Sequence, residues 1–456
     1  MGQAAGWIPF TAYRIKESLL APSVFQDSEA YHAVAAHPWL STALWTGSRA
    51  PGTPVLLKML GDNYSRYELF EVILGALAWG FLAWTAASMV PAGWRALVVS
   101  WAVLGFATAP LVVGWDWTAL TESPSLSCLA LLCAFGLWLV RRFTWVRLLG
   151  LGVAALWYAA LRDADIWDMT MVGIVLVAVG VTRVIRGAAV SGEAIVPTMR
   201  RNLPRAWRPL VVGAVLVAVS GTAGLAASVS HRNVLNIEEV FYVRIFPFPD
   251  RVAWFSDHGM PMGQPIDSAA AAAPVYPGQA KVVSLPITDP QWKPLADWFA
   301  ADGLSTYARY LVTNPAYVLL APFASPPLTY NNASGQLQFY VPPGRSLPVF
   351  ETVFVPSCWV VGALALVAVL LASALGTIGL ATWRFMVVFS AVGLVSMLLA
   401  WHGEGQEVTR HMVEGSVEVR LGVLLTLLLA LFGADQRSAP STNPLVGTPV
   451  PAVTTT

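Results

Sequence analysis

The sequence has few charged residues for its length. Only 12% of its 456 residues are Asp, Glu, Lys or Arg, and 56% are hydrophobic, whereas a soluble globular chain carries about 25% charged residues. Water is therefore excluded as the solvent for most of the surface, and a membrane protein is predicted. The formal net charge of only +1 also argues against a nucleic acid as the partner.

Cysteine is scarce as well. The three cysteines, Cys128, Cys133 and Cys358, fall within or at the edge of long apolar stretches. They provide neither a disulfide framework nor the spacing of a metal-binding motif.

Long apolar runs dominate the rest of the chain. A helix of about 20 apolar residues crosses the roughly 30 Å of hydrocarbon in a bilayer, and these runs do not alternate as the strands of a membrane barrel do. The predicted fold class is an all-α polytopic integral membrane protein with about nine spans. The spans are predicted at 70–92, 96–114, 123–141, 147–161, 169–184, 209–229, 356–377, 384–401 and 417–434, of which 147–161 and 169–184 are short.

The arginines predict the orientation, because short cytoplasmic loops retain positive charge during insertion. Every second loop between the predicted spans lies on the same side of the membrane. The loops on one side carry Arg95, Arg384 and the arginine clusters within 141–147 and 183–208, so this side is predicted to be cytoplasmic. The opposite, outer face then receives 1–69, 115–122, 162–168, 230–355 and 402–416.

Five regions of the chain follow from this topology. They are an outer N-terminal segment at 1–69, a transmembrane bundle at 70–229, an extracytoplasmic loop region at 230–355, C-terminal transmembrane helices at 356–434 and a disordered cytoplasmic tail at 435–456. Within the long loop region, 294–325 predicts one or two short helices that either lie on the bilayer surface or form a structured loop.

The N-terminal segment has no obvious apolar helix. Residues 7–25 carry Arg14, Lys16 and Glu17 in mid-segment, where each charge costs about 2.5–3.5 kcal/mol. We expect either a helix missing upstream or an N-terminus that is re-entrant or interfacial.

Candidate catalytic residues lie in the predicted outer loops. In the first loop, Asp27 and Glu29 lie in an aromatic stretch before a Gly- and Pro-rich turn that contains Arg49. A partly buried carboxylate is a better base, because burial raises its pKa toward the working pH. Alternatively, Asp27 caps a helix that begins at Ser28, and the two roles are compatible.

Two short outer loops add further acids. Glu122 begins a predicted span, where it either faces a site or compensates the helix dipole. Arg162, Asp163 and Asp165 crowd a helix end, and the two aspartates either bind a divalent cation through oxygen ligands or form an arginine-anchored turn. A divalent metal is the one cofactor that the sequence leaves open.

The last outer loop contains Glu407, Arg410 and His411. A guanidinium binds phosphate through paired hydrogen bonds at a fixed charge. Arg410 and His411 are therefore the first candidates for a phosphate site, and Arg49 and Arg162 are the second. The alternative is an intrahelical pair between Glu407 and Arg410 or His411 at the water boundary.

Asp257 and His258 lie in the stretch 242–261, which is dense in aromatic and polar residues. Aromatic faces pack on sugar rings while carboxylates bind hydroxyl groups. This stretch is expected either to recognise a sugar or acceptor, or to seal the loop against the membrane.

The order of these motifs is similar to that of a known superfamily. Asp27-Ser28-x-x-Tyr31 is followed by an aromatic stretch, the turn Gly47-x-Arg49-x-Pro51-Gly52-x-Pro54, the run Val55-Leu56-Leu57-Lys58 and then a series of spans. This pattern resembles polyprenyl-phosphate-dependent glycosyltransferases of the GT-C superfamily. The resemblance covers about residues 25–185 and, more loosely, the C-terminal spans.

The resemblance implies a GT-C-like helical bundle in a bacterial inner or plasma membrane, with an extracytoplasmic active site. It implies transfer of a sugar from a polyprenyl-phosphate donor to a glycan, lipid or protein acceptor, with Asp27 as the general base. The expected donor phosphate contacts are Arg410, His411, Arg49 and Arg162, and the expected substrate contacts are Glu29, Glu122, Asp163, Asp165, Glu407, Asp257 and His258.

Two other functional classes remain open. A transporter or flippase would be indicated by charges and helix breaks within the spans, together with internal repeats. A non-catalytic scaffold would leave Asp27, Glu122 and Arg410 dispersed.

Overall fold

The computed structural model describes residues 2–18, 23–191, 195–229, 234–263, 266, 290–324, 348–403 and 408–433. Regular structure within these ranges is helical. Among the described residues, seven helices are long and apolar enough to cross a bilayer, where a helix satisfies its own backbone hydrogen bonds. They are α5 (Tyr64–Ala87), α8 (Glu122–Arg141), α10 (Asp165–Ser191), α11 (Ile195–Val229), α20 (Cys358–Leu375), α21 (Leu380–Gly403) and α23 (Val413–Phe432).

The prediction of a multi-pass helical membrane protein is confirmed, but two of the nine predicted spans differ. The run 96–114 is broken into α6 (Trp94–Ala107) and a second piece, α7 (Pro110–Val113) with the 3-10 turn Gly114–Trp117, and the two are bent by 53°. Pro110 lies at the break and has no N–H for the helix ladder. The bent pair raises the count of candidate spans from seven to eight.

The other difference is α9 (Trp145–Leu161), which corresponds to the predicted span 147–161. It has 17 residues and is therefore about 25 Å long at about 1.5 Å per residue, short of the roughly 30 Å of hydrocarbon.

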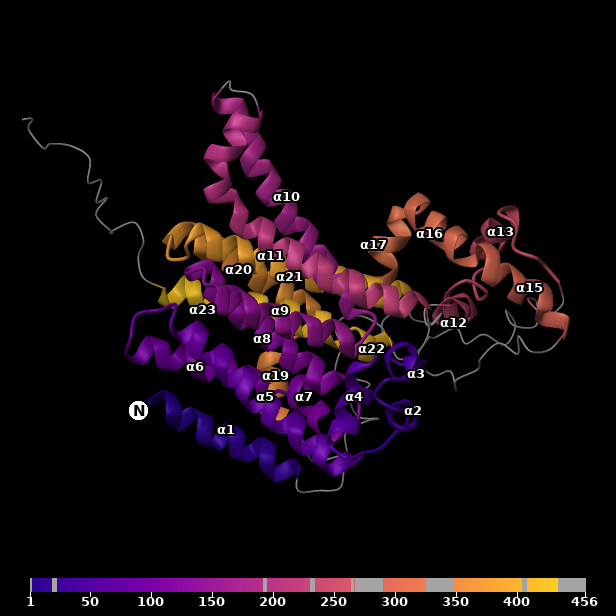
Figure 1. The fold of residues 1–456 in the computed structure, drawn as a ribbon, viewed down its shortest axis with the longest axis horizontal. Coiled ribbons are helices and arrows are strands. Elements are labelled where there is room, and N and C mark those ends of the chain that lie inside the picture. The colour runs from indigo at the N-terminus through magenta and orange to yellow at the C-terminus, as the bar shows by residue number, and fades with distance from the viewer. Residues whose placement is uncertain are drawn as a thin grey trace, which may run out of the picture.

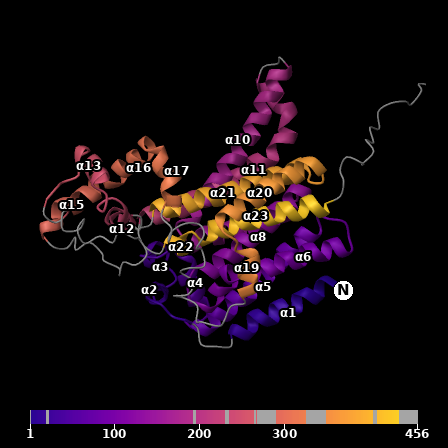
Figure 2. The same cartoon turned by 180° about the vertical axis from the view of Figure 1, so that it is seen from behind.

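The spans run between two opposite ends of the bundle (Figures 1 and 2). Four short helices lie at one end, here called the α2 end: α2 (Gln26–Ala35), α3 (Thr42–Thr46), α4 (Gly52–Met59) and α22 (Val408–His411). At the opposite end, Arg141 donates to the backbone carbonyl of Ser88 over 2.7 Å, and Thr377 donates to that of Ala430 over 2.7 Å.

The helices divide into a buried centre and an exposed apolar rim. Helices α5, α8 and α23 are the most buried of the seven candidate spans and belong to the main core. By contrast, α20 presents large apolar side chains such as Trp359 and Leu366 to the outside. Exposed apolar area of this extent is typical of a surface that does not face water, so α20 is a lipid-facing helix.

A second helical unit, here called the outer module because it lies outside the bundle of spans, packs on the α2 end of α21. It contains α12 (Val234–Arg244), α13 (Pro249–Asp257), a 3-10 turn (Pro290–Trp292), α15 (Lys293–Trp298), a π-helical turn (Phe299–Gly303), α16 (Leu304–Thr313) and α17 (Pro315–Ala324). Its own aromatic core surrounds Phe241. The Tyr307 hydroxyl donates to the His402 carbonyl over 2.9 Å, and Arg244 lies 3.9 Å from the centre of the Trp401 ring. The short helices predicted within 294–325 are present in this module.

The first helix, α1 (Gly2–Ser18), packs lengthwise against α5 and α6. Its Arg14 is buried and donates two hydrogen bonds of 2.6 Å to Asp116. The guanidinium occupies the space that a Cβ would take at Gly75 of α5. The sequence assigns this helix to the outer N-terminal segment and does not predict the buried pair.

We expect Arg14→Ala to lower the free energy of unfolding by about 3–5 kcal/mol, because it leaves the Asp116 carboxylate buried without its cation. The measurement is SDS-induced unfolding in mixed micelles. Lys16→Ala, an exposed cation of the same helix, is the matched control and should change stability little. Equal effects of the two substitutions would contradict the structural importance of the pair.

Candidate functional site

Asp27 lies in the first turn of α2 and binds two arginines. Its Oδ1 accepts from Arg49 over 2.6 Å and its Oδ2 accepts from Arg410 over 2.7 Å. The cap of α2 is Phe25, whose N–H donates to the Ser28 hydroxyl over 3.1 Å. Both carboxylate oxygens of Asp27 are therefore directed at arginines, and another residue supplies the cap.

Backbone pairing holds the segment before α2 against the loop that precedes α8. The N–H of Ser23 donates to the carbonyl of Trp117 over 3.0 Å, and the N–H of Ala119 donates to the carbonyl of Ser23 over 3.1 Å. This short pairing explains why Asp27 lies close to Glu122, although they are far apart in sequence.

Arg410 joins the two acids. It lies in the four-residue helix α22, directly before α23. Its Nε donates to Glu122 over 2.6 Å and its Nη1 to Asp27 over 2.7 Å. Glu122 is fully buried at the first position of α8, and the Arg410 side chain is only 4% exposed. A residue near the C-terminus thus connects two loops from the N-terminal third of the chain.

Arg162 extends the network on the far side of Glu122. It lies in the turn between α9 and α10, donates to Glu414 of α23, and lies 3.9 Å from Glu122. Its Nη2 is 2.7 Å from Nδ1 of His411. Because an arginine only donates hydrogen bonds, this nitrogen of His411 acts as the acceptor. We call the set of Asp27, Arg49, Glu122, Arg162, Arg410, His411 and Glu414 the arginine–carboxylate cluster.

The protonation states in the cluster follow from burial and charge. Burial raises the pKa of Asp27, but the Arg410 and Arg49 guanidiniums more than offset it, so its pKa lies below the ordinary value. Burial lowers the pKa of His411, and the neighbouring arginines, Arg162 first among them, lower it further. At neutral pH Asp27 is therefore an anion and His411 a neutral imidazole, in agreement with its acceptor role.

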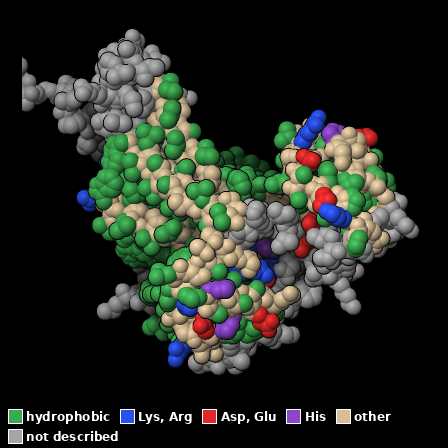
Figure 3. Space-filling model, turned by 45° about the vertical axis from the view of Figure 1, so that its right-hand side comes forward, with side chains coloured by type: hydrophobic (Ala, Val, Ile, Leu, Met, Phe, Trp, Pro, Cys, Tyr) green, Lys and Arg blue, Asp and Glu red, His purple; other side chains and the backbone are tan. Residues whose placement is uncertain are grey.

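The cluster is most accessible at Asp27 and Arg49. The Asp27 side chain is 23% exposed and that of Arg49 is 37% exposed. In the space-filling view, Lys or Arg and His side chains are visible in a recess between the outer module and the region of the molecule below it, next to residues that are not described (Figure 3). A ligand approaching from the α2 end would meet Asp27 and Arg49 first.

Several predicted site residues lie outside the cluster. Glu29 is exposed on α2, and Asp163 is half-buried in the turn after α9. Asp165 is buried at the start of α10, where Ser125 donates to it over 3.0 Å. No group of three or more His, Cys, Asp or Glu residues in the described ranges is arranged to hold a metal ion.

Asp257 and His258 belong to the outer module. Asp257 is exposed at the end of α13. The His258 ring stacks on Trp254 with 3.8 Å between ring centres, and Trp254 packs against the module's own aromatic core. Glu407 lies outside the described residues, and so do its predicted pairs with Arg410 and His411.

Sequence reasoning missed Glu414 as a member of the cluster. The available signal was the pair Glu414 and Glu418 at the start of an apolar span, because acids inside spans are rare and tend to face the bundle interior.

Comparisons of the chain with known proteins give no relative. No family model, curated protein or solved structure matches it.

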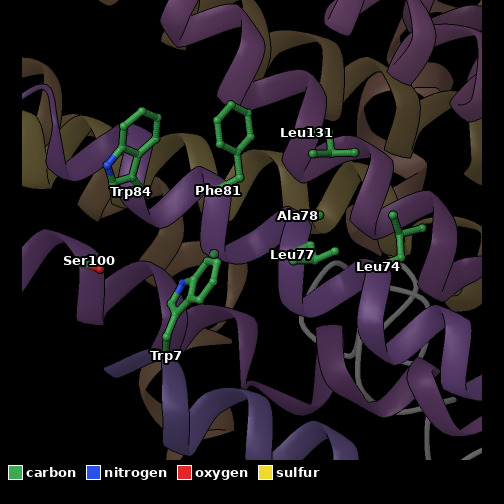
Figure 4. Close-up of a pocket in the computed structure, with 9 residues that line it drawn as sticks. Trp7, Leu74, Leu77, Ala78, Phe81, Trp84, Ser100 and Leu131 are labelled. Carbon is green, nitrogen blue, oxygen red and sulfur yellow. The ribbon is translucent and has the colours of Figure 1, made fainter. Parts of the chain in front are cut away.

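An apolar groove lies apart from the cluster. Trp7 of α1, Phe81 and Trp84 of α5, and Leu131 of α8 line it (Figure 4). Its lining contains no charged side chain, so it offers no acid, base or phosphate ligand.

The cluster offers one partly exposed carboxylate and three arginines within one connected network. Arginine side chains bind phosphate oxygens as they bind carboxylates. An anionic ligand can therefore compete with Asp27 for Arg49 and Arg410, and in doing so it would release the carboxylate.

The two arginines that bind Asp27 should contribute unequally to stability. Arg410→Met leaves buried Glu122 without its closest cation, so we expect a loss of about 3–5 kcal/mol of unfolding free energy. Arg49→Met removes a pair that is partly open to water and should cost only about 0–1 kcal/mol. SDS unfolding of both variants tests this, and an equal or reversed order would show that the buried connection does not hold the cluster together.

Proposed function

We propose that the protein is a GT-C-type glycosyltransferase that moves a sugar from a polyprenyl-phosphate donor to an acceptor hydroxyl at the outer face of a cell membrane. The observation that carries this proposal is the bonding of the Asp27 carboxylate to Arg49 and Arg410 at one end of a membrane helix bundle. That position suits a reaction between a lipid-borne phosphate and a polar acceptor. Helix α1 precedes the loop of Asp27 in the chain and packs lengthwise against α5 and α6.

Donor binding would activate the base in this mechanism. The two guanidiniums hold the pKa of Asp27 low against the effect of burial, which makes it a weak base. A phosphate that shares Arg49 and Arg410 would weaken this effect. The pKa of Asp27 would then rise toward the range in which a carboxylate accepts a proton efficiently.

The chemical step is a direct displacement. The acceptor O–H loses its proton to Asp27, and the oxygen forms a bond to the anomeric carbon of the sugar. The bond from that carbon to the phosphate oxygen breaks, and its electron pair stays on the phosphate. Arg410, Arg49 and Arg162 would stabilise the departing charge, while neutral His411 contributes hydrogen bonding only. Inversion at the anomeric carbon follows.

The acceptor is a glycan, lipid or protein that reaches the α2 end. We assign this end to the extracytoplasmic side of a bacterial inner or plasma membrane, since the loops with Arg95, Arg141 and Arg384 belong to the opposite end. Glu29, Asp257 and His258 are proposed to contact the substrate around the cluster.

Asp27→Asn is expected to abolish transfer, because an amide cannot accept the proton, while the protein stays folded. Wild-type and variant protein in lipid vesicles would receive a panel of radiolabelled polyprenyl-phosphate sugars and a membrane extract as acceptor. Asp297→Asn, an exposed acid of the outer module, is the matched control. Transfer at the wild-type rate by Asp27→Asn would rule out its role as the base.

A transporter or flippase is the second candidate, and two observations favour it. Buried acids lie inside spans, among them Glu68, Glu71 and Glu418, and the α6–α7 pair is bent by 53°. Translocation of a fluorescent polyprenyl-phosphate sugar across vesicle membranes without sugar transfer would favour this class. A pure scaffold is disfavoured, because Asp27, Glu122 and Arg410 are joined by hydrogen bonds instead of being dispersed.

A further inference from the structure

Helices α10 and α23, which lead from the cluster into the bundle, each carry two acids about one helical turn apart. Asp165 and Asp168 lie on α10, three residues apart, and Glu414 and Glu418 lie on α23, four residues apart. These spacings place each pair on one face of its helix. All four side chains are buried, with exposures of 2–3%, and we call them the acid ladder. Asp168 and Glu418 form its deeper end, because α10 and α23 both begin at the α2 end.

The deeper end of the ladder is tightly enclosed. The hydroxyls of Tyr158 and Ser396 donate to the same oxygen of Asp168, over 3.2 and 3.3 Å. Helix α21 approaches α23 closely at Gly393, where a Cβ would lie only 2.8 Å from the Cβ of Glu418. This close approach leaves no room for a larger residue and keeps Glu418 inside the bundle.

Positive charge around the ladder is too small to balance four carboxylates. Arg162 binds Glu414 and is shared with Glu122. Arg420, two residues after Glu418, donates to Ser416 and to the Pro356 carbonyl. Three further titratable groups lie near the acids, namely Tyr158 on α9 and Cys128 and Cys133 on α8. None of them carries a positive charge in either protonation state.

Two oxygens at the deeper end lack any hydrogen-bond partner among the described residues, namely Oδ1 of Asp168 and Oε2 of Glu418. Ser396, which donates to Asp168, and Gly393, which packs against Glu418, lie three residues apart on α21, so the two acids face the same turn of that helix. An ionised carboxylate only accepts hydrogen bonds, whereas a protonated one also donates. Several adjacent anions in this buried interior would each cost several kcal/mol, and a bound proton neutralises one of them and turns its oxygen into a donor.

We propose that Asp168 and Glu418 form a proton-binding site buried within the membrane-spanning region of the bundle. Its ligand is the proton, which needs only one carboxyl oxygen, whereas a metal ion needs several ligands that converge. Through Glu414 and Arg162 the site lies next to the arginine–carboxylate cluster. The proposal does not depend on sugar transfer and goes beyond the proposed function.

Infrared spectroscopy of the full chain in lipid nanodiscs at neutral pH tests the site, because a neutral carboxyl has a C=O band distinct from that of a carboxylate. We expect this band in the wild type, with a shift in D₂O. Asp168→Asn and Glu418→Gln should each remove a fraction of it, and Asp297→Asn should leave it intact. Other buried acids such as Glu68 and Glu71 also contribute, so the loss in the two variants decides the result.

Three outcomes would overturn the proposal: no neutral-carboxyl band in the wild type, a band that both variants retain in full, or a band that disappears when sodium or calcium ions are added. The last outcome would assign the site to a cation. If the substitutions prevent folding, the same spectrum is recorded on wild-type protein whose aspartate carboxyls are labelled with carbon-13. Labelling must shift a fraction of the neutral band, and an unshifted band would also overturn the proposal.

Discussion

A buried charged side chain must be neutralised by a group in direct contact with it. This constraint determines which segments of the protein come together. Glu122 is fully buried and Arg410 nearly so, so neither is stable in this position without the other. Their contact ties the start of α8 to the segment before α23. Through Asp27 the same arginine ties α2 to both. Apolar packing supplies the bundle, but it does not specify which loops converge at the α2 end.

The same requirement recurs at two other places with different solutions. Arg14 and Asp116 neutralise each other completely and attach α1 to the bundle. The acid ladder has too few cations, and we infer that protons complete its charge balance. The arginine–carboxylate cluster lies between these extremes, because its arginines are satisfied by carboxylates yet Asp27 and Arg49 remain accessible. Such a site can exchange a carboxylate for a phosphate without leaving a buried charge unpaired.

The sequence was sufficient for the class of fold and for the common face of four site residues. Long continuous apolar runs are predicted as membrane spans because few other structures contain them. The arginine-rich loops mark one side of the membrane and so place Asp27, Glu122, Arg162 and Arg410 together on the other. The sequence was insufficient wherever a contact depends on packing between distant segments. Arg14 and Asp116 lie 102 residues apart, and a polar N-terminal segment gives no sign that its arginine will be buried.

Other differences have equally local causes. The break at Pro110 divides a run that hydropathy alone treats as one span. Asp257 and His258 have the composition of a sugar-binding stretch, but the outer module folds around its own aromatic core, which sequence periodicity does not reveal.

The binding of a sugar-free polyprenyl phosphate to the purified protein in vesicles is the most direct test that the cluster is a phosphate site. We predict that Arg49→Met and Arg410→Met each weaken binding by at least about tenfold, because each removes a charge-assisted hydrogen bond. Asp27→Asn should bind as well as the wild type or more tightly, because the competing carboxylate is gone. Unchanged affinity in both arginine variants, or weaker binding by Asp27→Asn, would contradict the assignment of this cluster to a lipid phosphate.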